Sequence, residues 1–178
     1  MRGWLMLGAG IVVALAACGA PKHATGHSAC TLTDVRVRLD THAAGVAAGT
    51  EFLPLDFTNV SGSRCDLAGF PVVTAVTGRT GRAVGAAAAI DRGLAATAVV
   101  LSAGGAAHIW LRLADVLNVP ASRCRPATAP GLRVRLPGDA GSLFIRHPVM
   151  TCTKPVRGLD VLIVEPFRPG QAERGTAH

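Results

Sequence analysis

The sequence predicts an all-β fold, an antiparallel, immunoglobulin-like β-sandwich of about eight short strands held by disulfide bonds. Three observations support this fold class. Apolar and polar residues alternate with period two in several short segments, and glycine or proline separates those segments. The 178 residues also show no internal repeat and have room for one domain of ordinary size.

The first expected strand, Val35–Leu39, shows the alternation most clearly. Val35, Val37 and Leu39 alternate with charged residues, so we expect one face of the strand to be buried and the other to be exposed to solvent. The same pattern predicts strands at Leu53–Phe57, Ile109–Leu113, Leu132–Leu136 and Leu143–Ile145, a last apolar run at Leu159–Val164 that ends at Pro166, and shorter strands at Val72–Val76 and Ala98–Leu101.

Glycine and proline mark the expected turns between these strands, at Gly45–Gly49, Gly104–Gly105 and Pro137–Asp139. Only Leu113–Val119 is expected to form a helical turn, with no good capping residue before it and Pro120 after it. The alanine run Ala86–Ala89 lies between glycines and is predicted to be a mobile loop.

The N-terminus has the layout of a secretory signal peptide. Arg2 precedes an apolar stretch, Trp4–Leu15, that is too short to span a bilayer comfortably. The stretch continues into Leu15-Ala16-Ala17-Cys18-Gly19, which resembles a bacterial lipobox and implies cleavage before Cys18 with diacylglycerol on its thiol. An ordinary signal peptide with an incidental cysteine, or an uncleaved anchor, is the alternative.

These features divide the chain into four parts: a lipoprotein signal peptide (1–17), a flexible tether (18–29), a β-sandwich domain (30–167) and a disordered tail (168–178). The predicted location is extracytoplasmic, with the protein attached to the cell membrane by its N-terminal lipid.

Four cysteines remain once Cys18 is assigned to lipid. An even number in an exported domain predicts disulfides, and four cysteines allow three pairings. Sequential pairing, Cys30 with Cys65 and Cys124 with Cys152, is favoured because it closes two loops of moderate length. The chain has no Cys-x-x-Cys, and neither Cys124 nor Cys152 has a histidine at ligand spacing, so no metal or other cofactor is predicted.

One segment suggests a family. Thr58–Val73 has the sequence TNVSGSRCDLAGFPVV, which resembles the signature of the actinobacterial family DUF4232, a domain of unknown function. The family pattern is a strand ending in Thr-Asn-x-Ser, then a cysteine, then Leu-x-Gly-aromatic-Pro. The order of later features, the Gly104-Gly105 turn before Trp110, then Cys124 and Cys152, is similar too, so the resemblance covers roughly Cys30 to Val164.

The resemblance implies a secreted or lipid-anchored, disulfide-bonded β-sandwich of unestablished activity. Its motif residues here are Asn59, Ser61, Gly69, Phe70 and Pro71. Phe70 departs from the pattern, since Tyr or Trp is often found at this position. The ring of Phe70 can pack but cannot donate a hydrogen bond. Asn59 and Ser61 have side chains that cap turns, and Pro71 favours an extended entry into the next strand.

Composition limits the classes of partner. The chain is 49% hydrophobic and 16% charged, which excludes a disordered charged tail protein. The formal net charge of +7 comes almost entirely from arginines that are dispersed rather than clustered in a run, so no nucleic-acid partner is predicted. With 4% aromatic residues and no tyrosine, the chain has little from which to build a stacking platform for a ligand.

Candidate chemistry is sparse. His108 and Trp110 alternate with Ile109 and Leu111, so they share one face of a strand. Trp110 is expected to pack in a core, and the alternative is that Trp110 and His108 bind a ligand. The acids are spread singly, and His42, His108 and His147 lie in different elements, so no catalytic residue is predicted.

The sequence therefore favours a noncatalytic module that binds an envelope protein or glycan. The alternative is an envelope enzyme or metal-binding protein whose residues converge only in the fold. That alternative requires two or more of the histidines and acids within about 5 Å of each other in a concave site.

Overall fold

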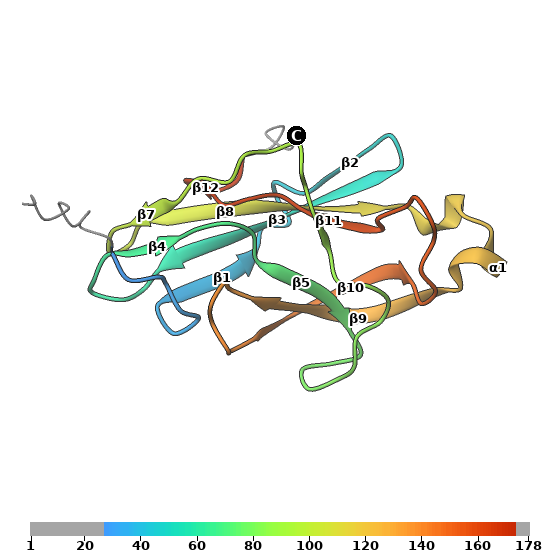
Figure 1. Ribbon diagram of the computed structural model, residues 1–178, viewed down its shortest axis with the longest axis horizontal. Helices are drawn as coiled ribbons and strands as arrows, with labels where there is room; N and C mark the ends of the chain where they lie inside the picture. Colours follow the sequence, from blue (N-terminus) through green and yellow to red (C-terminus); the bar gives the residue numbers. More distant parts are fainter. Residues whose placement is uncertain (1–26, 174–178) are drawn as a thin grey trace, which may run out of the picture.

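Two β-sheets pack face to face in the computed structural model, which describes residues 27–173 (Figure 1). The larger sheet has the strand order β1-β3-β8-β11-β6, with β2 paired to β3 and β12 paired to β8. The smaller sheet has the order β10-β9-β5, and β4 and β7 form a separate short pair. The predicted all-β sandwich is confirmed.

The strands are β1 (Val35–Leu39), β2 (Gly45–Ala47), β3 (Thr50–Asn59), β4 (Cys65–Leu67), β5 (Val72–Val76), β6 (Ala89–Ile90), β7 (Val99–Leu101), β8 (Ala106–Ala114), β9 (Pro126–Arg135), β10 (Leu143–Cys152), β11 (Leu162–Val164) and β12 (Arg168–Pro169). Between β8 and β9 lie a 3₁₀ turn, η1 (Val116–Asn118), and a single helical turn, α1 (Ala121–Cys124).

The core between the sheets consists of the inward positions of the alternating segments. Leu55 and Phe57 of β3 and Leu111 of β8 face Leu132 and Val134 of β9, and all five are buried. Because successive side chains of a strand point to opposite faces, the residues between them lie on the outer faces of the two sheets. The period-two pattern in the sequence thus determines which residues are available for function.

Four short strands, β2, β4, β6 and β12, lie outside the predicted set, because two or three residues are too few for an alternating pattern to show. The predicted loop at Ala86–Ala89 is wrong at its end, where β6 pairs with β11 in parallel, so the sheet is mixed rather than purely antiparallel. The predicted turn at Gly45–Gly49 is also shorter, since β2 occupies its first half and positive φ angles at Ala48 and Gly49 reverse the chain.

The expected helical turn after β8 exists, but its details differ from the prediction. Asp115 caps η1, because its carboxylate accepts a hydrogen bond from the N–H of Leu117. The chain also resumes a helical turn beyond Pro120, as α1, which ends at Arg125 in a left-handed conformation. Proline is unfavourable inside a helix but is compatible with a helix that begins directly after it. This explains the second turn.

The predicted disorder of the tail from residue 168 is wrong for residues 168–173. β12 pairs with β8, and the N–H of Gly170 donates to the carbonyl of Ala106 at 2.9 Å. At the other end, Ala29 bridges to Asp66, so the last tether residues join the sheets. The ordered domain therefore extends beyond its predicted limits of 30 and 167 at both ends.

The predicted signal peptide, Cys18, most of the tether and the last part of the predicted tail lie outside the described residues. Within residues 27–173, no helix is long and apolar enough to cross a membrane.

Candidate functional site

The outer face of the larger sheet carries the polar residues of β8. His108, Trp110 and Arg112 lie on this face, since they alternate with the core residues of the same strand. Across the β3–β8 register they are opposite Asp56, Pro54 and Phe52 respectively. The pairing brings an imidazole next to a carboxylate and places the one tryptophan of residues 27–173 between them and a guanidinium group.

The segment 168–173, here called the C-terminal strap, covers this face. His108 Nδ1 lies 3.0 Å from the carbonyl oxygen of Gly170, and the N–H of Ala172 donates to Asp56 Oδ1 at 2.9 Å. Ala172 and Ala43 pack against Trp110, whose side chain is only 2% exposed. Trp110 therefore belongs to a small second core under the strap, and its ring is not accessible as a binding platform.

Burial under the strap affects Asp56. Loss of solvent is the largest influence and raises the pKa of this carboxyl above its ordinary 3.8. The hydrogen bond from Ala172 opposes that shift, Asp40 adds to it, and His108 opposes it weakly. The carboxylate is thus positioned to hold the backbone of the strap.

Arg112 forms a second charged group on the same face. Its guanidinium contacts Asp91, which follows β6, and its Nε lies 3.9 Å from Oε1 of Glu165. The Glu165 side chain is 1% exposed, and its backbone N–H donates to the carbonyl of Trp110 at 2.9 Å. The guanidinium group of Arg112 stabilises the buried Glu165 carboxylate, because removal of Arg112 would leave that carboxylate buried without this cation.

The family motif residues Asn59 and Ser61 organise one end of the sandwich. The buried Asn59 side chain donates to the carbonyls of Ser63, at 2.8 Å, and Leu101, at 3.0 Å. Its Oδ1 accepts from the N–H and the hydroxyl of Ser61. One side chain therefore joins the end of β3, the following turn and β7.

The second half of the motif meets the end of the chain. Gly69 has a φ of +80°, a conformation that favours glycine, and its carbonyl accepts from the N–H of Phe167 at 3.3 Å. Phe70 packs against the main core, and Pro71 is buried. The ring of Phe167 lies edge-on to Phe57, with ring centres 5.1 Å apart. The motif residues thus stabilise the fold.

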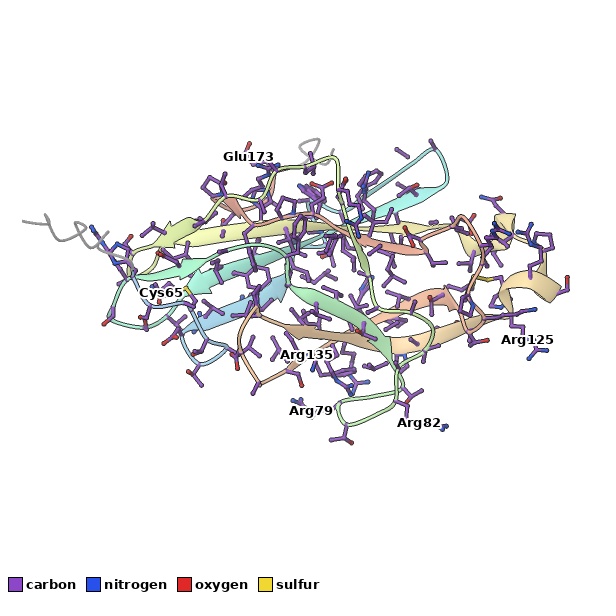
Figure 2. All side chains as sticks on the ribbon, viewed as in Figure 1. Cys65, Arg79, Arg82, Arg125, Arg135 and Glu173 are labelled. Carbon is purple, nitrogen blue, oxygen red and sulfur yellow. A yellow bond between two sulfur atoms is a disulfide. The ribbon has the colours of Figure 1, made fainter. Side chains whose placement is uncertain are left out.

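Both disulfides pair sequentially, Cys30 with Cys65 and Cys124 with Cys152, and all four cysteines are buried. The first ties the start of the domain to β4, at the end where Figure 2 labels Cys65. The second ties α1 to the end of β10, at the opposite end of the sandwich (Figure 1). Each end of the two-layered structure therefore has its own covalent link.

The three histidines occupy separate places. His42 is exposed in the turn after β1, His108 lies under the strap, and His147 Nε2 on β10 lies 3.9 Å from Glu51 Oε1 on β3. The last pair meets the distance asked of a catalytic pair, but Glu51 is 43% exposed, where an ion pair contributes little. Among the described residues, no group of three or more His, Cys, Asp or Glu is placed to hold a metal ion.

One charged surface was missed in the sequence. The outer face of the smaller sheet, here called the basic face, gathers arginines that are far apart in the chain: Arg79, Arg82, Arg133, Arg135 and Arg146. Counting runs of like charge does not detect them. The available signal was the alternation of Arg133 and Arg135 with apolar residues, together with long stretches that lack acids.

A search of curated proteins finds no match to this chain. A family model described as "Domain of unknown function (DUF4232)" matches residues 30–168, nearly all of the described domain. It spans both disulfides, the Asn59 turn, the Gly69–Pro71 segment and β8. The chain therefore belongs to the DUF4232 family.

Proposed function

We propose that this protein is a lipid-anchored module of the cell envelope that binds a partner rather than catalysing a reaction. The lipobox at Leu15–Gly19 supports the anchor, with Cys18 as the lipidated residue. Two buried disulfides in a domain of this size are typical of an oxidising, extracytoplasmic compartment.

The binding role rests mainly on one observation: the polar residues that cluster in the fold are used to hold its segments together. His108 and Asp56 contact the backbone of the strap, and Arg112 links Asp91 to Glu165. Asp34, Asp115 and Asp139 accept hydrogen bonds from backbone N–H groups of turns. A scaffold stabilised in this way presents its exposed surfaces and loops to a partner, and an envelope protein or glycan is the proposed class.

The experiment is photo-crosslinking in the producing cells with a photoreactive residue on an exposed surface. Leu117 and Val46 are suitable positions because their side chains are 69% and 78% exposed. A defined crosslinked species at one position, absent when the residue is placed at buried Leu111, supports a binding module. No specific crosslink at any of several exposed positions over both sheets contradicts it.

A further inference from the structure

The basic face begins with the outward side of the smaller sheet. On β9, Leu132 and Val134 point into the core, while Arg133 and Arg135 point away from it. On β10, Arg146 pairs with Gly131 of β9 and is exposed on the same side. Three guanidinium groups from two neighbouring strands therefore share one face.

The turn after β5 adds two more arginines, Arg79 and Arg82, to the basic face. Arg133 Nη2 donates to the carbonyl of Gly81 at 2.6 Å, and the carbonyl of Arg79 lies 3.4 Å from the same nitrogen. These contacts hold the turn that carries Arg79 and Arg82 against the sheet. Figure 2 shows Arg79, Arg82 and Arg135 on this side of the molecule, with Glu173 on the opposite side. Arg133 is thus a positioning residue for the basic face.

One acid, Asp139, lies close in sequence to these arginines, in the turn between β9 and β10, and its carboxylate accepts hydrogen bonds from the N–H groups of Leu32 and Gly141. Residues 67–90, 116–138 and 140–159 contain no Asp or Glu, and they include all three strands of the smaller sheet and the turn after β5. Within residues 27–173, no ion pair joins any of the five arginines to a carboxylate. Asp56 and Glu165 lie with the larger sheet instead. The five arginines therefore form a basic surface on which no described carboxylate is ion-paired to them.

We propose that the basic face docks on a bilayer surface that carries anionic phospholipid. Guanidinium groups bind phosphate through paired N–H donors, and each basic residue held near an anionic membrane contributes to binding. Val72, 41% exposed and opposite Arg135 in the β5–β9 register, adds apolar surface at the same place. This inference rests on the proposed envelope location and gives the domain a defined orientation there.

The length of the tether favours a membrane as the occupant. Only the ten residues 19–28 separate Cys18 from Ala29, the first bridged residue of the domain, and ten residues span at most about 36 Å when fully extended. A domain held so close to a bilayer meets it at high effective concentration, so a modest charge attraction is enough to orient it.

A soluble glycan fits this face less well. The strands of the smaller sheet carry a single aromatic residue, Phe144, and its ring lies over Gly131, where an added Cβ would be 2.6 Å from it. That ring is already used in packing, so the face offers charge and a broad sheet surface rather than a row of rings for stacking.

The test uses the chain without residues 1–18. These residues precede the domain, so their removal leaves both disulfides and the core intact. Binding to liposomes of phosphatidylcholine alone and of phosphatidylcholine with phosphatidylglycerol is measured by co-sedimentation in low salt. We expect binding to the anionic liposomes only, and weakening with added salt. Arg79→Glu with Arg135→Glu should lower the partition coefficient at least about 25-fold, since each lost basic contact weakens binding roughly fivefold.

The matched control is Arg36→Glu with Arg92→Glu, which makes the same change in net charge at exposed positions of β1 and the turn after β6. It should bind anionic liposomes much more tightly than the basic-face variant. Equal losses in both variants, or equal binding to neutral liposomes, would overturn the proposal. The proposal would also be overturned if the protein failed to bind liposomes but bound a soluble anionic polysaccharide in a way that depends on Arg79 and Arg135. Because the chain tested has no lipid, failure here leaves anchoring through Cys18 to its own test.

Discussion

Asp56 and His108 lie opposite each other on β3 and β8, and each holds a backbone group of the same short segment. Asp56 accepts from the N–H of Ala172, and His108 contacts the carbonyl of Gly170. One cross-strand pair thus holds two backbone groups of the strap that buries Trp110. The polar residues of β8 therefore have a structural reason for their positions.

Ala172→Asp should loosen the strap. Ala172 packs against the ring of Trp110, and a carboxylate there would be buried beside an apolar surface and close to Asp56. We expect a loss of about 1–3 kcal/mol in the free energy of unfolding and a red shift of tryptophan emission in the chain without residues 1–18. The control is Gln171→Asp at the exposed neighbouring position, which should leave the emission maximum unchanged. An unshifted Ala172→Asp spectrum would show that the strap does not shield Trp110.

Asp56 should make stability depend on pH. Because burial raises the pKa of Asp56 in the folded state, its favourable contribution is present below pH 3.8 and is lost as pH rises through the folded-state pKa. Asp56→Asn removes this titration and can still accept from Ala172. The free energy of unfolding of Asp56→Asn relative to the parent should therefore rise with pH across that window and then level off.

Urea unfolding of both proteins at a series of pH values checks this prediction. The pKa values of Asp34 and Asp139 are lowered by backbone and side-chain hydrogen bonds, but both proteins share those carboxylates, so their contributions cancel in the difference. A difference that stays constant or falls as pH rises contradicts the prediction.

The disulfides should leave no free thiol among Cys30, Cys65, Cys124 and Cys152 in the denatured, unreduced protein. The bonds close loops with sequence separations of 35 and 28 residues, and removing either pair by double serine substitution should cost about 3–4 kcal/mol in the free energy of unfolding. Thiol titration and denaturant unfolding measure the two effects. Two or more reactive thiols would refute the covalent framework.

Gly131→Ala should destabilise the smaller sheet at the position where Phe144 of β10 packs over β9. A Cβ at Gly131 would lie 2.3 Å from the carbonyl oxygen of Ile145 and 2.6 Å from the Phe144 ring, so β10 has to shift. We expect a loss of about 2 kcal/mol or more in the free energy of unfolding. Gly62→Ala is the control, because nothing lies within 4 Å of its added Cβ. Equal stability of the two variants would contradict the packing of Phe144 over β9.

Strands that alternate over five or more residues could be predicted from the sequence. Val35–Leu39, in which apolar and charged residues alternate, has the predicted limits, and so has the shorter candidate Val72–Val76. Strands β6 and β12 could not be predicted, since their two residues pair only because other strands bring β11 and β8 to them. Their positions depend on the assembled sheet and not on a local pattern.

The site was less predictable than the fold. The alternation in β8 predicts that His108 and Trp110 share one face of the strand. The strap that covers them could not be predicted, because it comes from a polar segment with no periodic pattern. The basic face was missed for a similar reason. Arg79 comes to the same side of the sheet as Arg135 through the β5–β9 pairing and the contact of Arg133 with the turn after β5, and both are long-range features.

The proposed envelope location depends most on the anchor at Cys18. Detergent phase partition of the full chain, expressed in cells that process lipoproteins, measures that anchor directly. The parent and an Ala20→Ser control should enter the detergent-rich phase, and the parent's mass should exceed that of the polypeptide by a diacylglycerol group. Cys18→Ser should move to the aqueous phase without that added mass. Identical partition of Cys18→Ser and the parent would contradict lipid anchoring and the proposed attachment of the domain to the cell envelope.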